Sequence, residues 1–214
     1  MRLEGIRLLI KKSLIQILKY RRNKIIKNKN FTIISNNCWG GMVYESLDLP
    51  KQSPTVGLFF MADEYIKFLC RFPDILKSDI RFIDPDESKY REFLKNDKRF
   101  GSYPIGLIDD VEIAFLHYHS REEVIEKWKR RVQRVNFNKI LFKMNDQNMC
   151  TDEHVKNFLS LDLPNKVFFT ARNIGISDKR IIKCTNSTND VIYASQEPVI
   201  FTKFYDVISE INKL

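Results

Sequence analysis

A short apolar run that breaks into polar residues and a glycine pair is the feature that most constrains the fold of this chain. Residues 31–41 have the sequence Phe-Thr-Ile-Ile-Ser-Asn-Asn-Cys-Trp-Gly-Gly. Open α/β sheets build ligand sites where a buried strand ends in a glycine-containing turn before a helix. Glycine lets the backbone approach a ligand, and the helix offers free N–H groups to an anion. The segment therefore predicts a small-molecule site at the carboxyl end of a strand.

Apolar runs alternate with helical patterns through the rest of the chain. Further strands are expected at residues 55–60, 80–83, 139–144 and 166–170, with a hairpin over 103–118. Helices are expected at 42–47, 62–72, 87–94, 122–135 and 152–161, and three further elements at 180–183, 191–194 and 202–211. Helices between apolar strands predict an α/β fold with a mainly parallel, Rossmann-like sheet flanked by helices and an inserted antiparallel hairpin.

The net positive charge of the chain comes from its N-terminal segment. Residues 1–30 contain ten of the 36 Lys and Arg residues and one of the 27 Asp and Glu residues, a net charge of +9 that equals the charge of the whole chain. We therefore divide the chain into a basic amphipathic helix and tract (1–30) and a single α/β domain (31–214). Because the domain itself is neutral, no nucleic-acid partner is expected.

The basic N-terminal segment favours contact with an anionic membrane surface or a partner. Apolar residues recur at three- and four-residue spacing between positions 3 and 18, with cations elsewhere around the helix. The alternative is a helix packed on the domain with solvated lysines. The sequence has no membrane-spanning apolar run, no cleavable signal peptide and no CxxC pair. We expect a cytoplasmic protein, peripheral on the inner membrane face if the basic helix binds lipid.

Six consecutive residues after the first strand form the first candidate site. They are Asn36, Asn37, Cys38, Trp39, Gly40 and Gly41. The amides can donate to an oxyanion or a sugar hydroxyl, and the indole can stack on a base or a sugar face. A helix N-terminus can lower the pKa of Cys38 and make the thiol nucleophilic. The alternative is a buried, inert thiol beside glycines that only serve a turn.

Two of the three histidines follow the second strand of the hairpin. His117 and His119 share one face of that strand. Histidine titrates near neutrality, so His117 is the candidate general base and His119 a candidate substrate contact. A structural histidine at a strand end is the alternative. Ser53 and Thr55, at the entry to the expected strand at 55–60, can contact a ligand or form a local turn.

Charged side chains supply the remaining candidates. Arg131 and Arg134 lie on one face of the helix at 122–135 and can bind a diphosphate, although i,i+4 ion pairs also explain much of that helix's charge. Asp146 follows the strand at 139–144 and is a candidate to bind the reacting hydroxyl at the same sheet edge. No metal site is predicted.

Several of these motifs occur together in a fixed order. They are Ser35-Asn-Asn-Cys-Trp-Gly-Gly41, Ser53-Pro-Thr55, Tyr103-Pro-Ile-Gly106, His117-Tyr118, Glu126-Lys-Trp128 with Arg131, and Asn145-Asp146. Over residues 31–175 the set resembles the bacterial family called domain of unknown function 1919. Members of that family are often labelled exopolysaccharide or capsule biosynthesis proteins, and sometimes acetyltransferases. The resemblance implies surface-glycan assembly and carries over no established catalytic residue, and the family often has Thr-Asp where this chain has Asn145-Asp146.

The candidates and the resemblance together predict a cytoplasmic transferase that modifies or extends a polysaccharide precursor. The glycan precursor and an activated donor, either an acyl-coenzyme A or a nucleotide sugar, are the expected partners, with no permanently bound cofactor. Acyl transfer is slightly favoured, because it needs only a base and oxyanion donors, whereas glycosyl transfer usually needs a carboxylate or a metal. The alternatives are a glycosyltransferase and, from another class, a non-catalytic membrane-surface scaffold of glycan assembly.

Overall fold

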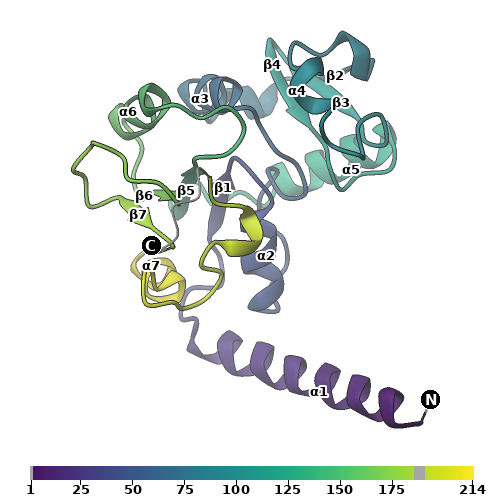
Figure 1. Ribbon diagram of the computed structural model, residues 1–214, viewed down its shortest axis with the longest axis vertical. Coiled ribbons are helices and arrows are strands. Elements are labelled where there is room, and N and C mark those ends of the chain that lie inside the picture. Colours follow the sequence, from purple (N-terminus) through teal and green to yellow (C-terminus); the bar gives the residue numbers. More distant parts are fainter. Residues whose placement is uncertain (1, 186–190) are drawn as a thin grey trace.

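The chain forms two β-sheets in different parts of the molecule (Figure 1). This computed structural model describes residues 2–185 and 191–214, and in the first helix the side chains of residues 7, 8 and 11–25. The larger sheet has four parallel strands in the order β1-β5-β6-β7. They are β1 (Thr32–Ser35), β5 (Ile140–Asn145), β6 (Lys166–Thr170) and β7 (Ile181–Lys183). The predicted α/β fold with a parallel sheet is therefore confirmed.

Helices cover both faces of the parallel sheet. One face packs on α2 (Trp39–Ser46) and α7 (Val207–Lys213), the other on α3 (Ala62–Cys70), α5 (Arg121–Val132) and α6 (Asp152–Ser160). Alternation along β5 explains the two layers. Leu141 belongs to the core under α2 and α7, whereas Phe142 and Met144 belong to the core under α3 and α6. Because both faces are covered, the strands are apolar almost throughout.

The predicted hairpin belongs to a second, antiparallel sheet. β3 (Ile105–Ile108) and β4 (Val111–Ala114) pair around a turn in which Asp109 has a φ of 54°. The expected strand at 80–83 is present as β2 (Ile80–Ile83), but it pairs with β3 in this sheet and not with the parallel strands. The helical pattern at 87–94 corresponds to η2 (Pro85–Glu87) and α4 (Arg91–Leu94), and η1 (Asp74–Lys77) precedes β2.

The prediction of a strand at residues 55–60 is wrong. Gly57 has a φ of +83°, which breaks extended pairing, and the segment makes only an isolated antiparallel bridge between Phe59 and Ala114 of β4. The next residue, Phe60, donates its N–H to the carbonyl of Asn36 just after β1 (3.0 Å). Residues 59 and 60 thus join the two sheets, and their apolar side chains are needed for packing.

The C-terminal part of the chain returns over the carboxyl edge of the parallel sheet. Residues 191–193, part of the element expected at 191–194, have no regular structure, and a short 3₁₀ turn, η3 (Ala194–Gln196), follows them. The second half of the pattern at 202–211 is helical and belongs to α7. Asp206 caps α7 by accepting a hydrogen bond from the Ser209 N–H (3.0 Å). The segment 191–198 is tied to this edge where the Ile192 N–H donates to Asp146 Oδ1, just after β5 (2.7 Å).

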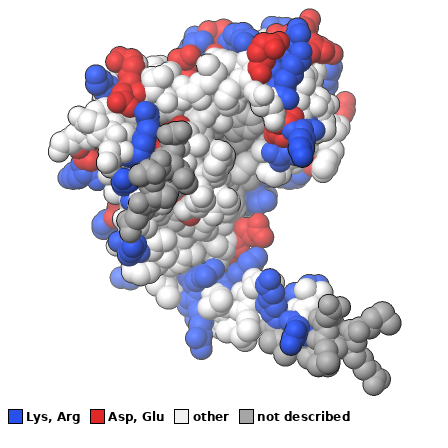
Figure 2. Space-filling view, viewed as in Figure 1, with Lys and Arg blue, Asp and Glu red and all other residues white. Residues whose placement is uncertain are grey.

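The basic N-terminal segment is a long helix, α1 (Arg2–Ile25), that projects from the rest of the chain (Figure 1). Its C-terminal end is anchored to the domain, where Asn23 donates to the Leu47 carbonyl (2.8 Å) and Ile26 is buried. The apolar side chains of Leu14 and Ile17 are about half exposed. Lys and Arg side chains are interspersed with uncharged ones along the described part of α1 in Figure 2. The last turn of α1 therefore packs on the domain, as in the alternative of a packed helix.

Candidate functional site

A cavity of about 620 Å³ lies between the carboxyl edge of the parallel sheet and the antiparallel sheet. Its lining includes Asn37, Cys38, His117, Gln147, Asn148 and Tyr193. The first two follow β1, Gln147 and Asn148 follow β5, and His117 follows β4. The carboxyl ends of β1 and β5 meet here because the two strands are parallel and adjacent. Three of the predicted site residues, Asn37, Cys38 and His117, are thus brought to one cavity.

His117 lies in the lining of this cavity and is partly open to solvent. Its backbone N–H donates to the carbonyl of Gly57 (2.9 Å), which fixes the chain at that point. Partial burial lowers the pKa of His117, and the positive charges of Arg99 and Lys51 and the neighbouring His119 lower it further. The imidazole is therefore neutral at neutral pH and able to accept a proton.

Cys38 is the N-cap residue of α2 and is only partly exposed. Burial raises the pKa of its thiol to about 11, an effect that the nearby charges of Lys143 and Arg99 reduce but do not reverse. The lowered pKa expected at a helix N-terminus is therefore not found. At neutral pH the side chain is a protonated thiol that lines the cavity.

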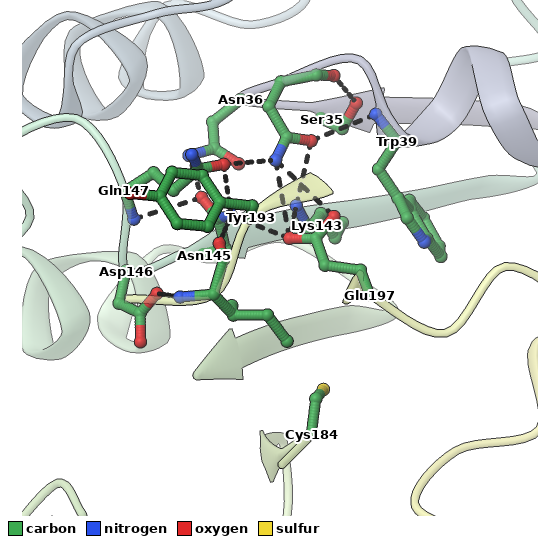
Figure 3. Close-up of polar contacts among 12 residues, drawn as sticks. Ser35, Asn36, Trp39, Lys143, Asn145, Asp146, Gln147, Cys184, Tyr193 and Glu197 are labelled. Carbon is green, nitrogen blue, oxygen red and sulfur yellow. Dashed lines mark hydrogen bonds and ion pairs between the residues drawn. The ribbon is translucent and has the colours of Figure 1, made fainter. Parts of the chain in front are cut away.

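A buried polar cluster that includes Lys143, Asn145 and Glu197 is shown in Figure 3, and Asn37 is hydrogen-bonded to it. Its centre is an ion pair between Lys143 on β5 and Glu197, with Nζ 2.5 Å from Oε1 and neither side chain exposed. Asn37 accepts from Lys143 Nζ (3.0 Å), and Asn145 donates to Glu197 Oε1 (2.7 Å). Gln147 accepts from both Asn37 and Asn145 and links the cluster to the cavity. Burial lowers the pKa of Lys143 and raises that of Glu197, while their mutual attraction opposes both changes.

Trp39 is buried and does not line the cavity, contrary to the expected stacking role. Its indole N–H donates to the carbonyl of Pro198 (2.7 Å), and its ring packs edge-on against Phe169 of β6. The backbone N–H of Trp39 donates to Asn37 Oδ1 (3.1 Å), which fixes that amide at the start of α2. The indole therefore anchors the C-terminal segment to α2.

The glycine pair serves close packing and not approach to a ligand. A Cβ atom on Gly40 would lie 3.0 Å from Ile33 Cγ2, and one on Gly41 would lie 2.8 Å from Val56 Cγ1. Neither residue has a positive φ. Glycine is required here because α2 crosses β1 and the segment at 53–58 with no space for side chains.

The hydroxyls of Ser53 and Thr55 are buried and bonded within the protein. Thr55 Oγ1 accepts from the Ser35 N–H (3.1 Å) and lies 3.0 Å from Ser53 Oγ. These side chains therefore satisfy the free edge of β1, where a neighbouring strand would otherwise bond. The ligand role predicted for them is not supported by their position.

The two arginines proposed to bind a diphosphate are apart from the cavity. Arg131 is buried and donates to the Val56 carbonyl (2.8 Å) and to the Tyr118 hydroxyl, so it holds the loop before Phe59 in place. Arg134 lines a different, shallow pocket beside Asn136. The N–H of Asn136 bonds to Thr32 at the start of β1, which is the opposite end of the sheet.

Three further candidates are structural or lie outside the cavity lining. Asp146 is buried and accepts from Thr170 Oγ1 (2.7 Å), Ala171 N (2.8 Å) and Ile192 N (2.7 Å), so it ties β5, β6 and the C-terminal segment together. Asn36 is buried, and its amide donates to Asn145 Oδ1 (2.9 Å). The His119 side chain is exposed, and its backbone N–H donates to Glu123 (2.7 Å) at the start of α5.

A second buried carboxylate, Glu64, lies at the start of α3 beside the antiparallel sheet. It accepts from Lys67, Lys89, Tyr90 and the Glu112 N–H. Burial tends to raise the pKa of Glu64, but these hydrogen bonds hold it below its ordinary value. Unlike Lys143, both lysines are partly exposed to solvent. Among the described residues, no group of three or more His, Cys, Asp or Glu side chains is placed to hold a metal ion.

The chain matches the family model "Domain of unknown function (DUF1919)" over residues 9–212. It belongs to this family. The match to DUF1919 extends on both sides of residues 31–175, which carried the resemblance, and includes most of α1. An uncharacterized protein of Haemophilus influenzae is 30% identical over 145 residues, 68% of this chain and 64% of the relative. The matched part thus spans just under two thirds of that relative's length.

The sequence alone did not point to Arg99, Lys143 or Glu197 as site residues of this DUF1919 member. Arg99 lines the cavity and pairs with Asp97 through Nη2 and Oδ2 (2.9 Å). Lys143 had one available signal, since it is the only charged residue in the apolar strand β5. Glu197 has none, because it follows a three-residue turn without a hydrophobic pattern.

Proposed function

We propose that the chain is a transferase that acts on a precursor of a bacterial surface polysaccharide, with the cavity between the two sheets as its active site. The observation that carries the proposal is the convergence of Asn37, Cys38 and His117 on this cavity. Its volume of about 620 Å³ lies in the range of small-molecule sites. The resemblance to proteins labelled as exopolysaccharide or capsule biosynthesis proteins supports the class of substrate.

Acyl transfer from an acyl-coenzyme A fits the side chains of the cavity best. A glycan hydroxyl oxygen attacks the thioester carbonyl carbon, and its proton passes to the neutral imidazole of His117. The C–S bond then breaks, and the coenzyme A thiolate takes the proton from His117. In this proposal the side-chain amides of Asn37 and Asn148, which donate to Gln147 Oε1 and to the Phe60 carbonyl in the structure, turn to donate to the oxyanion that forms in between. Cys38 stays protonated and forms part of the wall.

Glycosyl transfer from a nucleotide sugar is the second candidate. The observation in its favour is Asp97, a carboxylate in the cavity lining whose pKa the bonded Arg99 holds below its ordinary value. An ionised carboxylate near His117 can orient or deprotonate an acceptor hydroxyl. In this form of the proposal Arg99 faces the diphosphate of the donor.

Transfer assays with two labelled donors test the proposal. Purified protein is mixed with membranes from cells that lack it, and with acetyl-coenzyme A or UDP-glucose labelled in the transferred group. We expect label in the lipid-linked glycan fraction from one donor. His117→Ala should reduce this transfer by about 10²–10⁴-fold, as for loss of a general base. His119→Ala is the matched control, since that side chain does not line the cavity.

A scaffold function predicts a different result in the same assay. Glycan assembly would then survive His117→Ala and would depend on α1 instead. Transfer with neither donor, or equal transfer by wild type and His117→Ala, would contradict the enzyme proposal.

We also propose that α1 binds the anionic inner face of the cytoplasmic membrane, where lipid-linked glycan precursors are available. Its described apolar side chains are exposed, and cations such as Lys11 and Lys12 stand beside them. No helix among the described residues is both long and apolar enough to cross a bilayer. The Lys11→Gln/Lys12→Gln variant should bind phosphatidylglycerol vesicles about 30-fold more weakly, at roughly 1 kcal/mol per cation. Lys95→Gln/Lys98→Gln is the control, and equal binding by all three proteins would contradict the proposal.

A further inference from the structure

The carboxylate of Glu197 occupies a site that other segments of the chain build. Lys143 Nζ lies 2.5 Å from Oε1, Asn145 Nδ2 lies 2.7 Å from the same oxygen, and Asn37 Nδ2 lies 3.4 and 3.5 Å from the two oxygens. Lys143 and Asn145 belong to β5, and Asn37 to the turn after β1. A cation and two amides therefore converge on one anionic group at the carboxyl ends of adjacent parallel strands.

The segment that carries Glu197 is an irregular connection. It contains one three-residue turn, η3, and is held to the sheet edge at its two ends. At one end the Ile192 N–H donates to Asp146 Oδ1 (2.7 Å), and at the other the Pro198 carbonyl accepts from Trp39 (2.7 Å). Residues 193–195 of the same segment form one wall of the cavity. Glu197 is thus carried by a piece of chain that separates Lys143 from the cavity.

We propose that Lys143, Asn145 and Asn37 form an anion-binding site for a phosphoryl group, which Glu197 fills until a ligand displaces it. The phosphoryl group enters from the cavity, past Gln147 and Asn37. Segment 192–198 then moves away from the sheet edge, because Glu197 is rigidly part of it. Nucleotide sugars and coenzyme A both carry such a group, so the identity of the donor rests on the function proposed above. The anion site itself does not depend on the transfer chemistry.

When Glu197 leaves its position, another anion must take its place, because the buried Lys143 would otherwise have no counter-charge. Lys143 is fully buried, and an unpaired ammonium group in that position is costly. A phosphoryl group brings at least one negative charge and several acceptor oxygens, which match one ammonium and two amide donors. The position also agrees with the general placement of ligands in open parallel sheets, at the carboxyl ends of the strands.

A purely structural ion pair makes a different prediction for loss of Glu197. In that case the Glu197→Ala variant is destabilised and gains no affinity for anions. Under the proposal, removal of Glu197 takes away a competing group, so that the fraction of molecules with a free site rises and the apparent affinity rises with it.

The test measures binding of inorganic phosphate and pyrophosphate by calorimetry and by the rise in melting temperature. We expect Glu197→Ala and Glu197→Gln to bind at least about tenfold more tightly than wild type, because the site no longer has to be vacated. Lys143→Met/Glu197→Ala should lose this binding. Glu64→Ala is the matched control and should not bind phosphate more tightly than wild type. It also removes a buried carboxylate, but the lysines that pair with Glu64 are open to solvent.

A measurement on the wild-type protein covers the case in which these variants do not fold. Saturating pyrophosphate should accelerate hydrogen exchange of the Ile192 N–H, which is bonded to Asp146 at the sheet edge. Unchanged exchange, or equal phosphate binding by Glu197→Ala and the double variant, would overturn the proposal. Phosphate binding without donor turnover would leave the anion site standing and contradict only the transferase function.

Discussion

Lys143 Nζ and Glu197 Oε1 lie 2.5 Å apart, with both side chains removed from solvent, although the two residues are 54 positions apart in the chain. One residue comes from the second strand of the parallel sheet, the other from an irregular segment near the last helix. The pair fixes where the C-terminal segment crosses the sheet edge, and so it shapes one wall of the cavity.

Removal of the Lys143 charge should destabilise the protein strongly. Lys143→Met leaves Glu197 buried without a counter-charge, which costs about 3–5 kcal/mol of the free energy of unfolding. Urea unfolding followed by circular dichroism measures the loss. Lys156→Met, an exposed change on α6, is the control and should stay within about 0.5 kcal/mol of wild type. Equal stability of the two variants would mean that the pair is not formed.

The glycine at position 41 should tolerate no larger residue. In Gly41→Ala the new methyl group would lie 2.8 Å from Val56 Cγ1, and overpacking of this kind costs about 1–3 kcal/mol. Gly175→Ala is the matched control, since nothing lies within 4 Å of its Cβ position. Thermal melts of both variants test this, and Val56→Ala should restore part of the stability of Gly41→Ala. A stable Gly41→Ala protein would contradict the close crossing of α2.

The imidazole of His117 should titrate below its ordinary pKa of 6.5. Since the folded protein binds this proton less tightly than the unfolded chain, the contribution of His117 to stability increases as pH rises through the window just below 6.5. NMR titration of the ring protons gives the midpoint. Arg99→Gln should raise it because one of the causes is removed, whereas Arg130→Gln should not. A midpoint above 6.5 in wild type would rule out the neutral base at mildly acid pH.

The thiol of Cys38 should react slowly at neutral pH. With a pKa of about 11, little thiolate is present, and the alkylation rate should rise about tenfold for each pH unit up to that value. Mass mapping after iodoacetamide treatment compares Cys38 with the exposed Cys70. Faster reaction at Cys38 than at Cys70 at neutral pH would restore the nucleophile hypothesis. We also expect Cys38→Ser to retain transfer activity.

Local patterns predicted the elements of the parallel sheet well, because each buried strand is a continuous apolar run and each helix has a clear stripe. The strand at 166–170 has the predicted bounds in the structure. The run at 55–60 is also apolar, but Gly57 with its positive φ turns the backbone, and the segment makes only an isolated bridge from Phe59 to Ala114. A short apolar sequence is therefore compatible with a buried loop as well as with a buried strand, and the pattern alone does not distinguish the two.

The site was only partly predictable, for a related reason. Asn37, Cys38 and His117 stand at strand ends, which is where the sequence directs attention, and the cavity joins them. Arg131 and Trp39 have the chemistry of ligand contacts but are used to hold loops in place. Lys143 depends on a carboxylate far along the chain, and no local pattern connects the two residues.

The late position of Glu197 has a consequence for synthesis of the protein. On the ribosome, β1 cannot pair until Ile140–Asn145 have emerged, and Lys143 gains its counter-charge only 54 residues later. At translation rates of about 5–20 residues per second, this delay lasts roughly 3–11 seconds. During that interval a nascent sheet would carry an uncompensated ammonium group on its central strand. Folding of the parallel sheet is therefore expected to complete only after Glu197 has emerged from the ribosome.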